Sequence, residues 1–292
     1  MALRGIQPDA VEKRLKCLMY GVSGAGKTYA AISFPKPYLI DAEKGSENSQ
    51  YCAQLKKTGG AVFRTTDFDE MLAEIKELAI NKHDYRTLVI DPLTVIYNNV
   101  LEQCATKRIT AQNPDGMAHG GHYIASNAKM KQLMGLLLKL DMNVIITSHS
   151  KTEYGHNMTV LGNTYDCYKK LDYLFDLVFE IKKGALDSEA IVKKSRVENF
   201  NQGDRFPFSY DEIADRYGRE ILEKVSDSKI FATNEQVLLV TDAIESFNVS
   251  RETIDKWLTK AGVSALEDMP YNAMDAVIKH FESKQQQEET QQ

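Results

Sequence analysis

One octapeptide constrains this chain of 292 residues more than any other feature. Residues 21–28 read G-V-S-G-A-G-K-T and match the pattern G-x-x-x-x-G-K-[ST] at every fixed position. The glycines let the backbone curl so that amide hydrogens point at a phosphate, Lys27 can reach the β and γ oxygens, and the Thr28 hydroxyl can ligate Mg²⁺. A strand expected at residues 16–20 and a helix expected at residues 29–33 complete the arrangement typical of a phosphate-binding loop. The residues expected to bind the nucleotide are Gly21, Val22, Ser23, Gly24, Ala25, Gly26, Lys27, Thr28 and Tyr29.

Two apolar segments that end in carboxylates follow this loop. The run T-L-V-I-D ends at Asp91, which at the end of a buried strand could orient a magnesium shell. The run Y-L-I-D-A-E ends at Glu43, which could align and deprotonate a water that attacks the γ-phosphate. Each carboxylate also has a plainer alternative. Any buried strand can end in a surface Asp, and Asp41 with Glu43 could only begin a helix at residues 45–55, where the dipole favours acids.

The rest of the pattern is typical of an α/β protein. Hydrophobic residues make up 43% of the chain and charged residues 26%, which excludes collagen, a coiled-coil rod and wholesale disorder. Up to about residue 225, short apolar runs alternate with longer amphipathic stretches, which indicates a mainly parallel sheet. After residue 173, closely spaced strand-like runs predict antiparallel hairpins at the sheet edge. The expected strands are 17–20, 38–40, 87–90, 143–147, 177–181, 190–192 and 206–208, and the expected crossover helices are 71–80 and 128–140.

The composition changes toward the C-terminus. Residues 1–225 are expected to form the α/β core, and helical spacing takes over from about residue 231. A capping box that starts at Thr233 opens one helix, Ser250 caps a second, and a third follows. We therefore expect a three-helix domain over residues 231–282. The tail of residues 283–292 contains no apolar residue and is expected to be disordered.

Net charge, cysteine spacing and the lengths of the apolar stretches limit the possible partners and the cellular compartment. Thirty-six Lys and Arg against 41 Asp and Glu give a net charge of −5, so any nucleic-acid contact must come from local basic patches. The four cysteines have no regular spacing, which indicates reduced thiols. No apolar stretch approaches the ~18 to 20 residues that cross a bilayer, and the N-terminus lacks an apolar signal core. We expect a cytoplasmic protein without a membrane partner.

The order of these motifs resembles that of the RecA-like recombinase ATPases. The shared order is a phosphate loop, a strand that ends in Asp-Ala-Glu, a magnesium-Asp strand, and a strand that ends in polar residues, here I-I-T-S-H. The resemblance covers roughly residues 14–210 and implies a RecA-like P-loop NTPase core with ATP and Mg²⁺ as cofactors. It also implies Glu43 as the catalytic base and Ser148 or His149 as the sensor of the γ-phosphate. His149 could equally be a loop imidazole without a role.

The resemblance also implies a homo-oligomer, either a filament or a ring. In that family, subunits stack so that basic residues of one chain reach the nucleotide of the next, and the run I-V-K-K-S-R ending at Arg196 stands where that element would come. Lys194 and Arg196 are the implied trans-acting residues, with Lys193 as a further candidate. A cation supplied in trans neutralises transition-state charge only when the subunits are assembled. The alternative is a solvated basic face on an edge hairpin.

RecA-like proteins carry DNA on two loops, one after the magnesium strand and one after the sensor strand. In this chain, both positions contain basic and aromatic residues. These are candidates for DNA contacts, because amines can neutralise phosphates and tyrosine faces can stack on bases without reading sequence. Long polar loops are also where ordinary insertions accumulate. The candidate DNA-binding residues are Lys107, Arg108, Lys151, Tyr154, Lys169 and Lys170, with Tyr168 as a further stacking candidate.

Taken together, the chain looks most like the short, phage-borne RecA-like proteins of the single-strand annealing type. The resemblance implies an ATP-dependent protein that binds single-stranded DNA in the host cytoplasm and promotes annealing in recombination, with a single-strand-binding protein as a further partner. Two rival functions remain: a nucleotide-switched accessory ATPase such as a helicase loader or packaging factor, and a small-molecule kinase. The kinase is disfavoured because no arginine-rich lid follows the sensor strand and Glu43 is placed for water.

Overall fold

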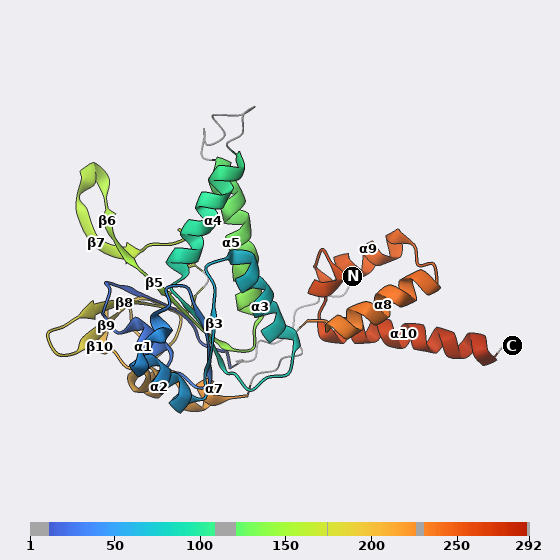
Figure 1. The fold of residues 1–292 in the computed structure, drawn as a ribbon, viewed down its shortest axis with the longest axis horizontal. Coiled ribbons are helices and arrows are strands. Elements are labelled where there is room, and N and C mark those ends of the chain that lie inside the picture. The colour runs from blue at the N-terminus through green and yellow to red at the C-terminus, as the bar shows by residue number, and fades with distance from the viewer. Residues whose placement is uncertain (1–11, 109–120, 174, 226–230, 291–292) are drawn as a thin grey trace, which may run out of the picture. The chain divides into compact units, whose positions relative to one another are not determined.

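The computed structural model describes residues 12–108, 121–173, 175–225 and 231–290. Its main feature is an eight-stranded sheet, together with a separate two-stranded hairpin (Figure 1). The strands of the sheet are β1 (Lys16–Gly21), β2 (Pro37–Asp41), β3 (Ala61–Arg64), β4 (Thr87–Asp91), β5 (Asn143–Ser148), β8 (Leu177–Lys183), β9 (Ser188–Ser195) and β10 (Arg205–Pro207), and the hairpin pairs β6 (Ser150–Tyr154) with β7 (Val160–Tyr165).

The sheet is mainly parallel. Its strand order is β10-β9-β8-β1-β5-β4-β2-β3. All strands from β8 to β3 run parallel, whereas β9 and β10 are antiparallel at one edge. The expected α/β class, with a parallel sheet and antiparallel edge hairpins, is confirmed.

Because the central strands are parallel, their carboxyl ends lie at one edge of the sheet. The register is Gly21 opposite Ile181, Tyr20 opposite Ser148, and Asp41 opposite Asp91. The phosphate loop and the carboxylate-ended strands are therefore brought to the same edge, although up to 127 residues separate Tyr20 from the end of β5 in the chain. In open α/β sheets, ligands bind at this edge.

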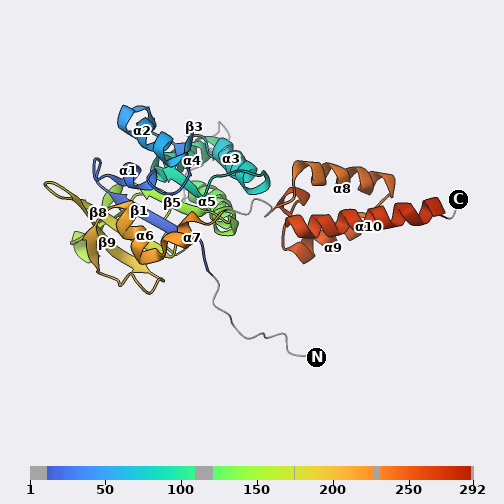
Figure 2. The same ribbon diagram turned by 90° about the horizontal axis from the view of Figure 1, so that it is seen from below.

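Helices α1 (Lys27–Ala31), α2 (Ser49–Thr58), α6 (Tyr210–Tyr217) and α7 (Arg219–Glu223) lie on one face of the sheet (Figures 1 and 2). Side chains alternate between the two faces of a strand, so Cys17 and Met19 of β1 and Phe179 of β8 point into this layer. They pack in one buried cluster with Ile32 and Leu222. The cluster fixes the strands beneath the phosphate loop.

Several elements differ from the sequence-based expectation. The expectation missed β3, α6 and α7, as well as helix α4 (Leu93–Arg108). The apolar residues of α4 are spread around the helix, which leaves no amphipathic signal. Helix α5 (Gly121–Lys139) starts seven residues before the expected 128–140. The expected first DNA loop is therefore shorter than predicted, and its residues 109–120 lie outside the described residues.

The chain divides into two compact units, the first of which holds the sheet. The second comprises Asp69–Asp84, Lys139–Asp141 and Ser226–Gln292. Its helices include most of α3 (Phe68–Ile80), together with α8 (Asn234–Ser246), α9 (Arg251–Ala261) and α10 (Tyr271–Thr290). The first unit ends at Val225, and the second unit takes in residues 69–84 and 139–141, which the sequence analysis placed in the α/β core.

Local signals place the C-terminal helices where the sequence predicted them. Thr233 forms the capping box with Gln236 ahead of α8, and the Ser250 hydroxyl accepts from the amide of Thr253 at the start of α9. Gly262 ends α9 in the left-handed conformation, with φ of 69°. Helix α10 continues to Thr290, so helix occupies most of the segment expected to be disordered.

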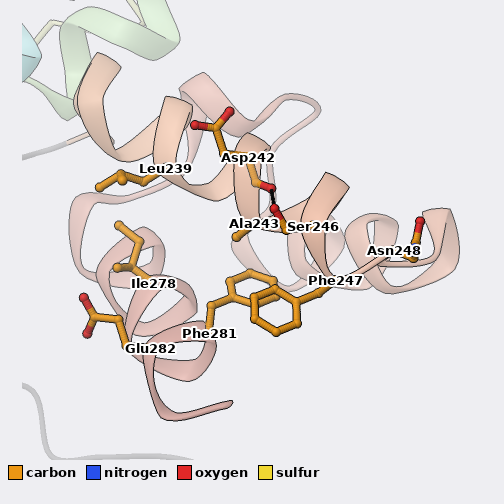
Figure 3. A pocket seen from close by; sticks show the side chains of 9 residues that line it. All are labelled: Leu239, Asp242, Ala243, Ser246, Phe247, Asn248, Ile278, Phe281 and Glu282. Atoms are coloured by element: carbon orange, nitrogen blue, oxygen red, sulfur yellow. Dashed lines mark hydrogen bonds between the residues drawn. The ribbon is translucent and has the colours of Figure 1, made fainter. Parts of the chain in front are cut away.

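A groove of about 740 Å³ lies between α8 and α10 of the second unit (Figure 3). Leu239 and Ile278 face each other across it, and the rings of Phe247 and Phe281 stack at 5.4 Å between centroids. Carboxylates of Asp242 and Glu282 lie at its rim.

The C-terminal segment, residues 231–292, carries the acidic excess of the chain. Residues 231–292 contain 11 Asp and Glu against five Lys and Arg, whereas residues 1–230 contain 30 against 31. The net charge of −5 is thus a property of the C-terminal segment, and the α/β part is close to neutral.

The close approach of β8 to the start of the phosphate loop gives a stability prediction. A Cβ added to Gly21 would lie 2.3 Å from the carbonyl oxygen of Ile181, which is main chain and cannot move aside. We expect Gly21→Ala to lower the free energy of unfolding of the ligand-free protein by about 1–3 kcal/mol, as overpacking typically does. Thermal melting followed by circular dichroism measures this. Gly45→Ala is the matched control, because nothing lies within 4 Å of its added Cβ, and equal melting of both variants would contradict the prediction.

Candidate nucleotide-binding site

The phosphate loop joins β1 to α1 through two glycines in the left-handed region. Gly24 has φ of 72° and Gly26 has φ of 82°, which are backbone conformations that residues other than glycine rarely adopt. Gly26 is also the residue that precedes α1. The fixed glycines of the motif therefore have a backbone reason, and they give the loop the curl that a phosphate requires.

Lys27 is folded onto its own loop. Its Nζ donates to the carbonyl oxygens of Gly21 at 2.8 Å and Val22 at 2.9 Å. Burial lowers the pKa of Lys27, while the nearby carboxylates of Asp91 and Glu43 act in the opposite direction. The ammonium thus sits among the carboxylates and the loop carbonyls, at the carboxyl edge of the sheet.

Asp91 joins three elements of the site. Its Oδ2 accepts from Thr28 Oγ1 of α1 at 2.6 Å, and its Oδ1 accepts from Thr147 Oγ1 of β5. Its main-chain oxygen accepts from the amide of Ala42 at 2.9 Å, just past β2. Burial raises the pKa of the Asp91 carboxyl, and the two hydroxyl donors partly offset that rise. Thr147 was not among the expected site residues.

The expected magnesium residues, Thr28 and Asp91, are brought together. A hydroxyl and a carboxylate oxygen are hard donors of the kind that Mg²⁺ prefers, and Mg²⁺ commonly uses one or two protein ligands plus substrate phosphates. No group of three or more His, Cys, Asp or Glu that could hold a metal occurs in the described residues. The donor set therefore fits a Mg²⁺ ion that arrives with a nucleotide, held by Thr28 and Asp91.

Asp41 and Glu43 have different environments. Asp41 is buried, and its carboxylate accepts from the amides of Glu43, Gly45 and Ser46 at 2.9–3.2 Å and from the Ser46 hydroxyl at 2.5 Å. This is the helix-starting role that the sequence left open for both acids. Glu43 instead points outward, and its Oε1 lies 2.9 Å from Nε2 of His149. Glu43 and His149 therefore form a half-exposed pair beside the phosphate loop.

The two candidate sensor residues also differ. Ser148 is fully buried; its hydroxyl lies 3.0 Å from that of Thr94 and donates to the carbonyl of His149 at 2.9 Å. The Thr94 hydroxyl in turn accepts from the amide of His149 at 3.0 Å. Ser148 and Thr94 thus hold the main chain at His149, and only the His149 side chain is presented to the site.

A cleft of about 580 Å³ adjoins the phosphate loop. It is lined by Ala25, Gly26 and Tyr29, by the C-terminal half of α2, by the turn between β8 and β9, and by the start of α6. Tyr29 is 46% exposed and adjoins the loop. Among the expected nucleotide-binding residues, Tyr29 is the one outside the phosphate-loop motif, and it lines the cleft next to the loop.

Lys194 and Arg196 lie near the amino end of β8, whereas the phosphate loop lies near its carboxyl end. Near them Ser195 is opposite Leu177, the first residue of β8. Lys194 Nζ donates to the carbonyl of Asp172, and Arg196 donates to that of Tyr173 at 3.1 Å. These cations are not brought to the nucleotide site of their own chain.

The second candidate DNA segment is the β6–β7 hairpin, which stands out from the sheet (Figure 1). Tyr154 is 54% exposed near its tip, and Lys151 pairs with Asp166 at 3.0 Å. Lys169 and Lys170 follow the hairpin and are exposed. The stacking expectation for Tyr168 is wrong, because its side chain is buried.

Three exposed apolar residues of the hairpin, Met158, Val160 and Leu161, were missed by sequence analysis. The sequence does not show that these residues are exposed, and only the structure does. In the first candidate segment, Lys107 lies in the last turn of α4 and Arg108 ends it.

The hairpin is attached next to the phosphate loop. Tyr20, the residue before Gly21, donates from its hydroxyl to the carbonyl of Asn163 at 3.2 Å, and its ring meets that of Tyr165 edge-on at 6.1 Å. On the other strand, the carbonyl of His149 accepts from the amide of Asp166 at 2.8 Å. Both ends of the hairpin thus contact residues adjoining the candidate site.

These features define a P-loop nucleotide-binding domain built on a mainly parallel sheet. The chain belongs to the AAA domain family, whose model matches residues 13–208. That range contains the phosphate loop, both carboxylate strands and the hairpin.

The chain has little similarity in sequence to curated proteins or to the solved structure of the RadB recombinase. No curated protein matches the chain. Among solved structures, the crystal structure of the RadB recombinase matches with 18% identity and a TM-score of 0.43, over 66% of this chain and 86% of that chain. Within the described part of the chain, no helix is both long and apolar enough to span a membrane.

The buried carboxyl of Asp91 gives a prediction in which stability and binding move in opposite directions. Because its pKa is raised in the fold, the charged form costs stability at neutral pH, and this cost disappears as the pH falls through that pKa. We expect Asp91→Asn to raise the free energy of unfolding at pH 7 by about 0.5–2 kcal/mol and to lose the thermal shift caused by Mg²⁺-ATP. The stability gap should close as the pH is lowered. Thermal melting across pH, with and without Mg²⁺-ATP, measures both effects.

Asp41→Asn is the matched control, because Asp41 faces main-chain amides that an amide nitrogen cannot replace as acceptor. It should lower stability by about 1 kcal/mol. A loss of stability in Asp91→Asn at pH 7 would contradict the account.

Proposed function

We propose that the protein is a Mg²⁺-requiring ATPase that binds single-stranded DNA as a homo-oligomer and promotes strand annealing in phage recombination, in the host cytoplasm. The observation that carries the proposal is the 2.9 Å pair between Glu43 and His149 at the edge of the phosphate loop. His149 immediately precedes the hairpin that carries Lys151 and Tyr154. One short contact thus links the candidate base for hydrolysis to the candidate DNA-binding element.

In the proposed reaction, Lys27 exchanges its bonds to the loop carbonyls for the β and γ oxygens of ATP. Glu43 orients a water for in-line attack on the γ-phosphorus and accepts its proton as the bond to the ADP oxygen breaks. His149, which pairs with Glu43 in the structure, turns to the γ-phosphate and senses it. Thr28 and Asp91 hold the Mg²⁺, which when bound neutralises phosphate charge. The ring of Tyr29 borders the cleft proposed for the base.

The proposed coupling to DNA acts through the two attachments of the hairpin. A phosphate that displaces His149 from Glu43 moves the residue that leads into β6, and Tyr20 ties β7 to the strand that enters the phosphate loop. DNA that orders the hairpin therefore favours one position of His149 over the other. Reciprocity requires that ATP alters the DNA affinity by the same factor.

For DNA contacts we propose Lys169 and Lys170, together with Lys107, Arg108 and Lys151, as partners of backbone phosphates. Tyr154 is proposed as a base-stacking residue, since its ring is exposed. This combination binds single strands without sequence preference, as an annealing protein requires.

We further propose that Lys194 and Arg196 act in trans on the nucleotide of a neighbouring subunit. Their position at the sheet end away from their own phosphate loop supports this role. The assembly proposed is a filament or a ring. Residues 1–225 are proposed as the ATPase core and residues 231–282 as an appended helical domain, with a single-strand-binding protein as a partner.

Replacing the proposed base separates binding from turnover. We expect Glu43→Gln to reduce ATP turnover by about 100-fold or more, because general-base catalysis typically contributes that much. ATP affinity should change little, since the amide retains the size of the carboxylate. Phosphate release and the fluorescence of a labelled ATP analogue measure the two quantities. Glu47→Gln, an exposed acid 4.0 Å from Arg64, is the control and should keep full turnover.

Undiminished turnover in Glu43→Gln would show that the base is misassigned. Binding of ATP with almost no turnover in the unaltered protein, with or without DNA, would favour the accessory-ATPase function. Transfer of the phosphate to a metabolite would favour the kinase.

The DNA proposal predicts a change in salt dependence. Replacing Lys169 and Lys170 by Gln should weaken binding to an oligo-dT strand and reduce the slope of log affinity against log salt by about 0.7 per lost phosphate contact. Fluorescence anisotropy at several salt concentrations measures the slope. The matched control replaces Lys256 and Lys279, which pair with acids in the second unit at 2.8 Å. An unchanged slope in the Lys169 and Lys170 variant would remove these residues from the DNA site.

A further inference from the structure

A second ammonium lies beside the phosphate-binding loop. Lys183 is the last residue of β8, two residues beyond Ile181, which is the register partner of Gly21. Its Nζ lies 3.3 Å from the position that a Cβ on Gly24 would take. The ammonium therefore lies against the middle of the loop, where the curled main chain is shaped for phosphate.

The alternation of β8 explains why Lys183 and not its neighbour reaches the loop. Phe179 and Ile181 point into the buried cluster beneath α1, so Lys183, two residues further, is on the same face. Lys182 is on the opposite face. The two lysines are adjacent in sequence and both exposed, yet only one lies on the face that carries the loop.

Lys183 is available to an anion. In the portion of the chain that the structure describes, its side chain makes no hydrogen bond and no ion pair, whereas the ammonium of Lys193 on the next strand lies 3.4 Å from Glu180. The turn that follows Lys183 lines the 580 Å³ cleft through Leu186, Asp187 and Ser188. An ammonium without a side-chain partner thus lies against Gly24, and the next two residues of the loop, Ala25 and Gly26, line the cleft.

We propose that Lys183 binds the terminal phosphates of the nucleotide in cis, as a second cation beside Lys27. This inference rests on the proposed ATPase function and adds a residue to it. As the bond to the γ-phosphorus breaks, negative charge builds on the oxygens between the β and γ phosphates, and a preorganised ammonium there stabilises the transition state. Lys27 approaches from α1, whereas Lys183 approaches from β8, so the two charges flank the same phosphates.

The test compares steady-state ATP turnover of the full chain with that of Lys183→Gln. We expect kcat to fall about 10- to 100-fold, less than the loss of a fully enclosed donor, because Lys183 is exposed. KM should change much less than kcat, and the melting temperature without nucleotide should stay unchanged. Lys183→Arg keeps the charge and should recover part of the turnover. Lys182→Gln, on the opposite face, is the matched control and should behave as the unaltered protein.

A turnover of Lys183→Gln equal to that of the unaltered protein would overturn the proposal. So would an equal loss in Lys182→Gln, since the effect would then be one of general charge. If the unaltered protein neither binds nor hydrolyses ATP, the proposed function itself fails, and this outcome is seen before any variant is compared.

A mixing experiment tests whether Lys183 acts within its own subunit. In mixed oligomers of Lys183→Gln and Glu43→Gln chains, each site lacks one of the two residues if both act in cis, so turnover should stay at the level of the separate variants. Recovery of turnover on mixing would show that Lys183 serves a neighbouring site and would overturn the cis assignment.

Discussion

The candidate site depends on the carboxylate of Asp91 being held by two hydroxyls from different parts of the chain. Thr28 lies in the first turn of α1, Thr147 is near the end of β5, and Asp91 ends β4 and bonds to both hydroxyls. A buried carboxylate is costly unless it accepts hydrogen bonds, so the fold and the site constrain each other. The parallel strands bring the three residues together, and the bonds then fix the helix against the sheet edge.

Much of this arrangement could be predicted from the sequence, because it is encoded locally. The phosphate loop needs glycines at fixed positions, and Gly24 and Gly26 have the positive φ values that explain them. Strands β1, β4 and β5 are buried along their whole length and are therefore apolar runs that stand out. The start of α8 could also be predicted, because its capping box lies within the four residues from Thr233 to Gln236.

What could not be predicted depends on contacts between distant segments. Nothing near Thr147 indicates that it faces Asp91, since that requires the register of β4 and β5. The sequence left open whether Asp41 and Glu43 only begin a helix, and which of Ser148 and His149 faces the site. In both pairs the structure buries one side chain and exposes the other, and this depends on packing against distant residues. Tyr168 was misjudged for the same reason, and Lys183 was overlooked because only strand pairing puts it beside the loop.

The gathering of the acidic residues in the C-terminal segment has a consequence for how nucleic-acid binding would be measured. A tethered polyanion repels another polyanion, and both this repulsion and the attraction of lysines for phosphate grow as the ionic strength falls. The two effects oppose each other in a titration with salt. The slope of log affinity against log salt, measured on the intact chain, would thus indicate fewer released counterions than the lysines displace. Removal of the acidic segment would steepen this slope, although no new contact with the nucleic acid is made.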